Sequence, residues 1–364
     1  MRDEIPDRAR PQQPGASHDR SPFHPGEQAL QARVGVRDRV ERFGRRFIRD
    51  FMSDQHRAFF AELPFVVVGA LDLRNRPRAS VLTGAPGFMS SPDQRTLRVD
   101  ALPADGDPIG AGLFAGATVG MLGIQPETRR RNRLNGTVVG RDRCSFLVRV
   151  QQSFGNCPQY IQARAPVQMP QSVRETRRVR SESARLSTAA AALVACADTF
   201  FIATASPFAG GRDPAEGVDV SHRGGKPGFV HVSEEDGRSV LTSPDFAGNR
   251  FFSTFGNLLR NPAASIVFLD FVSGHLLSLA GNAEVMWDGP EIASFAGAQR
   301  LLRFRVDEGV WIENAVPLRW SAPQWSPQLP ATGSWEDVAR AGPAADGADE
   351  HQRLFADPDQ TAKP

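Results

Sequence analysis

The chain has 364 residues, of which 40% are hydrophobic and 23% are charged, and its formal net charge is +2. These values indicate a globular protein long enough for two domains. The balanced charge argues against a nucleic-acid-binding or anionic-membrane-binding protein, because both carry a concentrated basic excess. Three widely spaced cysteines without a CxxC pair argue against a disulfide framework and a zinc site. No stretch resembles a secretory signal or an apolar membrane span, so we expect a cytoplasmic protein.

Both ends of the chain and a central connector differ in composition from the rest. The ends are rich in Pro, Gly, Arg and Asp and contain little apolar surface to bury. The connector QMPQSVRETRRVRSESARLS is polar and rich in arginine. The sequence therefore predicts a disordered tail (1–27), a first domain (28–165), a linker (166–186), a second domain (187–326) and a second disordered tail (327–364).

Each predicted domain begins with a helical pattern that leads into a short apolar run. In the first domain RRFIRDFMSDQHRAFFAEL leads through Pro64 to FVVVGAL. In the second domain STAAAALVACAD leads to TFFIATAS. The β-branched and aromatic residues of these runs predict strands, and the segments before them predict helices.

A longer pattern then occurs twice along the chain. Residues 80–89 read SVLTGAPGFM and residues 221–230 read SHRGGKPGFV, and both fit Ser-x-x-x-Gly-x-Pro-Gly-Phe. Apolar residues around a Gly-x-Pro-Gly turn predict a strand, a tight turn and a second strand. The apolar runs VGMLGI and ASIVFL follow, and each is succeeded at the same distance by a glycine, Gly136 or Gly281. We interpret the pattern as an internal duplication of a β-rich domain.

The ordered motifs of both halves resemble a known family. The second half contains DVSHRGGKPGFV, GNRFFSTFGNLLRNP and IVFLDFVSGHLLSLAGNAEV, and the first contains RASVLTGAPGF, VGMLGI, RRRNRLNG and FGNCPQYIQAR. Over roughly residues 45–320 they resemble the FMN-binding split β-barrels related to pyridoxamine 5′-phosphate oxidase, in their long tandem form. The resemblance implies a mainly β (α+β) fold of two tandem split β-barrels with short flanking helices, packed as an internal pseudo-dimer. It also implies FMN in the groove between the barrels, although other members of the family bind haem or the deazaflavin F420.

The second copy of the repeated element carries polar groups where the first copy is apolar. Val81 and Leu82 of the first copy correspond to His222 and Arg223 of the second. Arginine, lysine and hydroxyl groups bind phosphate, and glycine allows a ligand to approach the backbone closely. The expected cofactor-binding residues of this stretch are Ser221, His222, Arg223, Gly224, Gly225 and Lys226. The alternative for Lys226 is a solvated residue in a hairpin turn.

The stretch GNRFFSTFGNLLRNP offers a second group of phosphate ligands. A helix beginning near Ser253 or Thr254 would direct its N–H groups and hydroxyls at an anion. The resemblance places this segment beside the flavin phosphate and ribityl chain. The candidates are Asn249, Arg250, Ser253, Thr254 and Asn257. The alternative is that Asn257 and Asn261 merely cap and end a short helix.

The segment RRRNRLNG of the first half has no charged counterpart in GHLLSLAG of the second half. On a strand, Arg131 and Arg133 share one face with Arg129, and their charges repel unless solvent or an anion neutralises them. Either this face is solvated, or Arg131 and Arg133 reach across the groove to a flavin held by the second half. The second alternative predicts one composite FMN site per chain.

These patterns predict an FMN-dependent oxidoreductase of unknown substrate, with no convincing acid–base catalyst of its own. Its expected partners are a small-molecule substrate or electron donor, or a separate reductase, and the chain would act as a monomeric pseudo-dimer or a homodimer. The alternatives are a flavin- or haem-binding electron-transfer or sensor protein, and a barrel used only for dimerisation. A haem would need an axial ligand such as His222, His231 or His275. We interpret Cys157 and His56 as structural, with a redox thiol as the alternative for Cys157.

Overall fold

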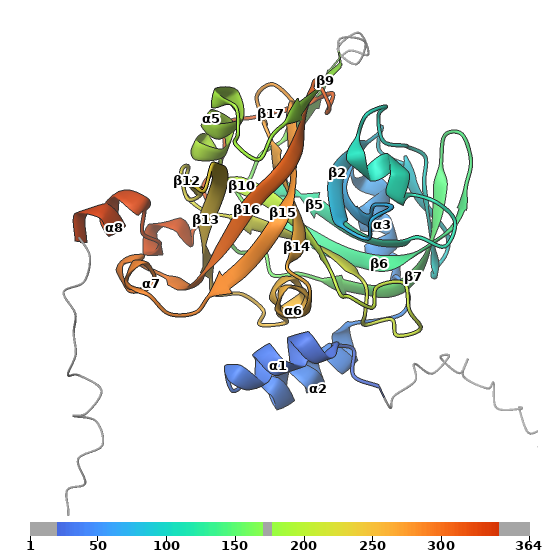
Figure 1. The fold of residues 1–364 in the computed structure, drawn as a ribbon. Coiled ribbons are helices and arrows are strands. Elements are labelled where there is room, and N and C mark those ends of the chain that lie inside the picture. The colour runs from blue at the N-terminus through green and yellow to red at the C-terminus, as the bar shows by residue number, and fades with distance from the viewer. Residues whose placement is uncertain (1–19, 170–176, 342–364) are drawn as a thin grey trace, which may run out of the picture.

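The computed structural model describes residues 20–169 and 177–341, in which two large antiparallel sheets lie side by side with short helices around them (Figure 1). The described α-helices are α1 (Pro25–Arg33), α2 (Arg37–Phe47), α3 (Asp54–Glu62), α5 (Thr188–Cys196), α6 (Ser253–Arg260), α7 (Pro290–Ser294) and α8 (Trp335–Ala341). Three short 3₁₀ helices are η1 (Pro108–Gly112), η2 (Pro126–Thr128) and η3 (Leu329–Ala331). The fold is therefore mainly β in an α+β arrangement, as the sequence predicts.

The two large sheets have the same strand order. The first sheet runs β2-β1-β5-β6-β7-β4-β3 and the second runs β11-β10-β14-β15-β16-β13-β12. Each strand of the first sheet thus has a counterpart at the same place in the second. Among the described residues, strand pairing closes neither sheet into a barrel.

The strands of the first sheet are β1 (Phe65–Leu71), β2 (Pro77–Thr83), β3 (Met89–Asp93), β4 (Thr96–Val99), β5 (Thr118–Gln125), β6 (Arg130–Arg141) and β7 (Phe146–Gly155). The strands of the second are β10 (Thr199–Ala205), β11 (Val218–Gly224), β12 (His231–Glu235), β13 (Arg238–Phe246), β14 (Ala263–Leu269), β15 (Leu276–Met286) and β16 (Ala298–Glu313). A further strand, β9 (Arg178–Glu182), pairs with β16, and β8 (Pro166–Gln168) pairs with β17 (Leu318–Trp320).

The repeated Gly-x-Pro-Gly-Phe element forms the same turn in both sheets. Gly87 and Gly228 both adopt a positive φ, of 95° and 81°, which favours glycine. A Cβ at Gly84 would lie 2.4 Å from the side chain of Phe88, and one at Gly225 would lie 2.5 Å from that of Phe229. The glycines at these places therefore let the following phenylalanine fold back under the turn.

Apolar side chains form three large clusters, one on the inner side of each sheet and one between the two sheets, and a smaller fourth cluster contains Phe23 and Phe251. In β1, Val66 and Val68 belong to the interior of the first sheet, whereas Phe65 and Val67 face the second sheet. β1 and β10 are thus buried on both faces, which explains why both sequences are mostly apolar without alternation. The contacts between the sheets are reciprocal, since β11 lies against β5 and its counterpart β2 lies against β14.

The predicted tails and linker contain more structure than their composition suggests. Phe23 and His24 are buried within the predicted N-terminal tail, and α1 begins at Pro25. In the predicted C-terminal tail, the indole of Trp335 on α8 donates to the backbone oxygen of Phe229 over 2.8 Å. The predicted linker contributes β8 and β9. Residues 1–19, 170–176 and 342–364, which fall in the same predicted segments, lie outside the described residues.

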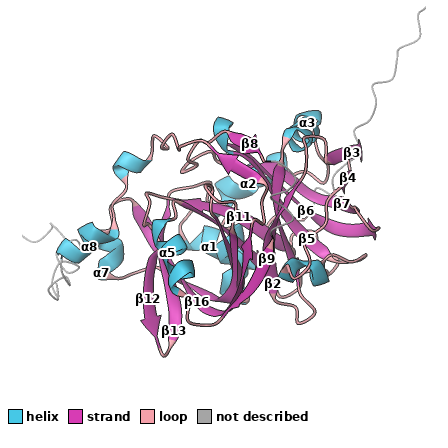
Figure 2. Cartoon of the chain, turned by 90° about the horizontal axis from the view of Figure 1, so that it is seen from above, coloured by secondary structure: helices cyan, strands magenta, loops and turns pink. Residues whose placement is uncertain are grey.

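The structure found in the predicted tails and linker has one physical cause. Each of the three segments is too polar to form a core of its own, but each adds a few apolar or aromatic side chains to a core built by the sheets. Composition averages over such isolated side chains and therefore predicts disorder. Figure 2 shows α8 and α7 together at one end of the second sheet, away from the first sheet.

Candidate functional site

A pocket lies where the first sheet meets the second, with about 940 Å³ of empty space including its open mouth. The first sheet contributes β6, the end of β5 and the segment after β7. The second contributes β11, the end of β13 with the loop after it, the start of α6, and β16. The lining residues are Leu122, Arg131, Arg133, Asn156, Cys157, Gln159, Tyr160, Ser221–Gly224, Pro244–Arg250, Phe252–Phe255, Gln299 and Arg300.

Two arginines of β6 cross from the first sheet to the second. Arg131 donates through Nε to the backbone oxygen of Cys157 over 2.6 Å, and its Nη1 lies 3.1 Å from Nδ1 of His222. Arg133 donates to Oδ1 of Asp219 over 3.0 Å and to the hydroxyl of Ser221. Because β6 alternates its side chains, both arginines point to this groove. The structure thus excludes the solvated outer face as the place of this pair.

The second sheet supplies a matching set of polar groups. The hydroxyl of Thr254 donates to that of Ser221 over 2.9 Å. Arg223 donates to Asp245, and Nε of Arg300 lies 3.1 Å from the other oxygen of the same carboxylate. Asp245 therefore balances one of the two positive charges beside it.

The start of α6 faces the pocket, and the side chain at its N-cap position accepts no hydrogen bond from the N–H groups of the first turn. Phe252 occupies the N-cap position in a left-handed conformation, with φ of 65°, and makes no side-chain hydrogen bond to the helix. The first turn of an α-helix has N–H groups without intrahelical partners, which attract anions. Ser253 and Thr254 add hydroxyls at the same point, as the sequence predicts.

The charges of the lining are strongly unbalanced. Five arginines line the pocket with one carboxylate, that of Asp245, while Asp219 pairs with Arg133 from outside the lining. Burial, with Arg133 and Arg223 nearby, lowers the pKa of Arg131 to about 10. Burial disfavours the charged form of Arg131, and an anion in the pocket would favour it.

His222 is neutral in this setting. Burial first, and then the charges of Arg131 and Arg223, lower the pKa of its imidazole well below the usual range. Since arginine can only donate, Nδ1 of His222 is the nitrogen that accepts from Arg131. The imidazole therefore adds no positive charge and helps to hold Arg131 in place.

Most of the predicted cofactor-binding residues line this one pocket. These are Arg131, Arg133, Ser221, His222, Arg223, Gly224, Asn249, Arg250, Ser253 and Thr254. At Gly224 the group that lies close to the backbone belongs to the protein and not to a ligand. A Cβ on this residue would lie 2.1 Å from the backbone oxygen of Tyr160.

Three predicted residues lie outside the lining. Lys226 donates through Nζ to the backbone oxygen of Thr332 over 2.6 Å. The backbone oxygen of Gly225 accepts from the side chain of Gln162. Asn257 is fully buried beneath the pocket, where its amide donates to Thr204 and Asp219. Each of these residues therefore supports the fold around the site.

Several lining residues carried no recognisable signal in the sequence. Arg300 and Asp245 lie in strands of unremarkable pattern, although Arg300 is buried, with 4% of its surface exposed. Tyr160 and Phe246 come from opposite halves of the chain, and their rings lie 4.9 Å apart with an interplanar angle of 31°. Only the pairing of the two sheets brings such residues together.

The two residues treated as structural lie in different places. Cys157 lines the pocket, and it is a free thiol of intermediate exposure. His56, on α3, is not among the lining residues, and its Nδ1 lies 2.9 Å from the hydroxyl of Ser153. His56 therefore packs α3 against the first sheet.

The counterpart groove, beside β2, has a different character. A second pocket lies there, lined by Val81, Leu82, Thr83, Leu102, Pro103, Ala104, Asp107, Arg177, Ile312 and Ala315. Burial raises the pKa of Asp107 to about 6. This groove contains one arginine, compared with five in the first. The described residues contain no helix long and apolar enough for a membrane span, and no His, Cys, Asp and Glu grouping suited to a metal ion.

Comparison of the chain with known proteins finds similarity to solved structures only, and each match is distant. No model of a protein family matches it, and no curated protein matches it. Among solved structures, HupZ of Group A Streptococcus is 12% identical over 34% of this chain and 90% of HupZ, with a TM-score of 0.26. A putative pyridoxamine 5′-phosphate oxidase from Lactobacillus delbrueckii is 11% identical over 29% of this chain and 95% of its own, with a TM-score of 0.24.

A Clostridium acetobutylicum protein of the pyridoxinephosphate oxidase family, related to general stress protein 26, is also similar. It is 12% identical over 36% of this chain and 89% of its own, with a TM-score of 0.23. The structural neighbours therefore include HupZ and members of the pyridoxamine phosphate oxidase group, each matching roughly a third of this chain.

Proposed function

We propose that the pocket binds FMN and that the chain is an FMN-dependent oxidoreductase built of two split barrels packed as an internal pseudo-dimer. One observation carries the proposal. Arginines of the first sheet and hydroxyls, arginines and a helix start of the second converge on one pocket that contains a single carboxylate. Such a set of donors suits a phosphate-bearing ligand that spans both halves.

The lining can satisfy both the phosphate and the ring system of FMN. Ser253 and Thr254 with the first-turn amides of α6 would hold the phosphate. Nε of Arg133 and Nε of Arg223 are buried and have no hydrogen-bond partner among the described residues. Unpaired buried donors are costly, so an acceptor in the pocket would stabilise them. The paired rings of Tyr160 and Phe246 offer a flat surface beside the ring system.

When bound, FMN would supply the hydride or electron transfer, and the protein would supply binding, orientation and charge. The cations of Arg131 and Arg223 would stabilise the extra negative charge of a reduced flavin. Neutral His222 would keep Arg131 pointing into the pocket without withdrawing its charge.

The counterpart groove supports one FMN site per chain. Val81 and Leu82 occupy the places of His222 and Arg223. The carboxyl of Asp107 also lines this groove, and its ionised form would repel a phosphate. The haem alternative has less support, since of the proposed axial ligands only His222 is among the lining residues and its Nδ1 accepts from Arg131.

The test is an absorbance spectrum of the purified protein followed by titration with FMN. We expect flavin bands, or saturable quenching of flavin fluorescence, at one FMN per chain. Reduction of the bound flavin by NADH, NADPH or reduced F420 would then identify the donor. A Soret band would favour the haem-binding alternative, and a colourless protein that ignores added FMN would overturn the proposal.

A further inference from the structure

The loop that forms one wall of the pocket has a conformation that needs support. This pocket loop, residues 247–252, contains Arg250 and Phe252 with φ of 60° and 65°. Left-handed backbone at residues other than glycine costs free energy and persists only where surrounding structure fixes it. Both residues line the pocket, and Phe252 begins α6. The shape of the site therefore depends on what holds this loop.

Several of the contacts that hold the loop come from the N-terminal end of the chain, and the ring of Phe154 on β7 adds another, 5.8 Å from that of Phe251. We define the N-terminal segment as residues 21–47, which comprise α1 and α2. The side-chain amide of Gln31, fully buried, donates to the backbone oxygen of Phe251 over 3.1 Å. The ring of Phe251 lies 5.2 Å from that of Phe23 and 5.9 Å from that of Phe43. One polar and two aromatic contacts thus fix the residue between the two strained positions.

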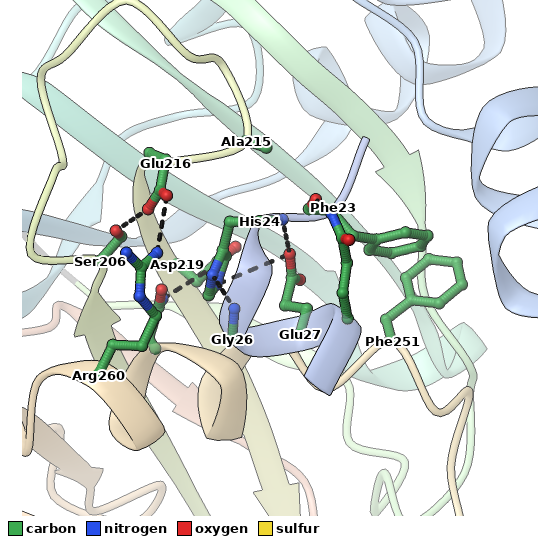
Figure 3. A network of polar contacts seen from close by, with 12 residues as sticks. Phe23, His24, Gly26, Glu27, Ser206, Ala215, Glu216, Asp219, Phe251 and Arg260 are labelled. Carbon is green, nitrogen blue, oxygen red and sulfur yellow. Dashed lines mark hydrogen bonds and ion pairs between the residues drawn. The ribbon is translucent and has the colours of Figure 1, made fainter. Parts of the chain in front are cut away.

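The same segment also fixes the start of α6. A Cβ on Gly26 would lie 2.1 Å from the backbone oxygen of Gly256, and one on Gly256 would lie 2.5 Å from the backbone nitrogen of Glu27. The first turn of α1 and the first turn of α6 therefore touch backbone to backbone. Figure 3 shows this place, with His24 and Glu27 at the start of α1 and the rings of Phe23 and Phe251 beside them.

A network of buried polar groups stabilises the start of α1. Glu27 accepts from the backbone nitrogen of His24 over 2.9 Å, while Nδ1 of His24 accepts from that of Gly26 over 3.1 Å (Figure 3). At the end of α1, the guanidinium of Arg33 lies 4.2 Å from the ring centre of Trp287, which Arg300 of the pocket also contacts. Of the described residues that line the pocket, none belongs to the N-terminal segment.

We propose that the N-terminal segment is a positioning strap, which holds the pocket loop and the first turn of α6 in the conformation that binds the ligand. The inference builds on the proposed FMN site. The strap touches the loop and helix that present Arg250, Ser253 and Thr254, and it contributes none of the described residues that line the pocket. Docking of the strap and binding of FMN are therefore coupled, and by reciprocity each favours the other by the same factor.

Two substitutions test the strap at different contacts. Gln31→Glu retains the oxygen that accepts from Arg37 but loses the amide that donates to Phe251. Gly26→Ala pushes α1 away from Gly256. The matched control is Arg39→Gln, at an exposed residue of α2 in the same segment. Thermal unfolding of each variant first establishes that it folds.

Two readouts separate positioning from general stability. The FMN dissociation constant should rise about fivefold or more in Gln31→Glu and Gly26→Ala and stay unchanged in Arg39→Gln. Amide hydrogen exchange of residues 256–260, measured without FMN, should accelerate in the first two variants alone. Folded variants with wild-type FMN affinity and wild-type exchange in α6 would overturn the strap.

The test remains decisive if a variant does not fold or if FMN does not bind. In the wild type, saturating FMN should slow amide exchange in α1, at residues 28–34, and unchanged exchange there would contradict the coupling. If the wild type binds no FMN, the proposed function fails. Exchange of α6 in the FMN-free variants then decides whether the strap positions the loop.

Discussion

Gly136 and Gly281 occupy the same place in their two sheets. Each lies at a register shift, between β6 and β7 or between β15 and β16. A Cβ on Gly136 would lie 2.1 Å from the backbone oxygen of Arg149, and one on Gly281 would lie 2.0 Å from that of Arg305. At both bulges the neighbouring backbone comes too close for any side chain.

Gly136→Ala and Gly281→Ala should therefore destabilise the protein by similar amounts, about 2 kcal/mol or more each, because backbone must move to admit the methyl group. The measurement is urea-induced unfolding. Gly110→Ala is the control, since a Cβ there meets nothing within 4 Å. If only one of the two variants lost stability, the two sheets would not share this constraint.

Arg131→Gln and Arg133→Gln should each weaken FMN binding by roughly tenfold, because each removes a charged donor from the pocket. Arg130→Gln serves as the control on the same strand. Its guanidinium lies on the opposite face, 5.0 Å from the ring centre of Phe59. Flavin fluorescence titration gives the three affinities. Equal affinities for all three variants would contradict the composite site.

The buried carboxyl of Asp107 should make stability depend on pH. Burial raises its pKa from the ordinary 3.8 to about 6 in the folded state. The hydroxyl of Ser80 and the backbone nitrogen of Ile109 donate to the carboxyl and offset part of this rise. The folded state therefore favours the protonated form, and this contribution to stability is present at low pH and lost as the pH rises through 6. The two pKa values correspond to about 3 kcal/mol at most.

Asp107→Asn should accordingly be more stable than the wild type at pH 8 and gain little at pH 4. Urea unfolding at both pH values measures the difference. Asp105→Asn is the control, because Asp105 is exposed two residues away. The same gain at both pH values would show that the titration of Asp107 is not its cause.

A buried ion pair joins the end of the first half to the start of the second. Arg164 donates to both oxygens of Asp198, and both side chains are less than 10% exposed. Arg164→Met should destabilise the protein by about 3 kcal/mol, because it leaves a buried carboxylate without a partner.

The double variant Arg164→Met with Asp198→Asn should recover most of that loss, since no charge then stays buried. Arg185→Met provides the surface control. Arg185 pairs with Glu234 in solvent, and its loss should cost about 0.5 kcal/mol or less. Thermal unfolding ranks the variants, and a double variant as unstable as Arg164→Met would indicate lost packing instead.

The sequence predicted features that repeat locally or alternate along one strand. The two Gly-x-Pro-Gly turns were recognisable because each position has a fixed backbone requirement. Arg131 and Arg133 were recognisable because like charges at alternating positions share one face of a strand and repel unless solvent or an anion neutralises them. The start of α6 at Ser253 was also predicted from residues adjacent in sequence.

Features that depend on distant contacts could not be predicted. Arg300 is one of three arginines on β16, and only the fold shows that it reaches Asp245. Lys226 sits in a glycine-rich turn that suits a phosphate, yet it donates to Thr332 of a segment predicted to be disordered. Phe23 is buried because Phe251 lies beside it, and no local sequence pattern predicts that contact.

The identical strand order of the two sheets within one chain has an evolutionary consequence. In a homodimer, every substitution appears twice, so both grooves must change together. Here Val81 and His222 hold corresponding positions but are encoded separately. One groove can therefore carry five arginines while its counterpart carries one. The covalent connection turns a symmetric scaffold into one whose two faces can specialise.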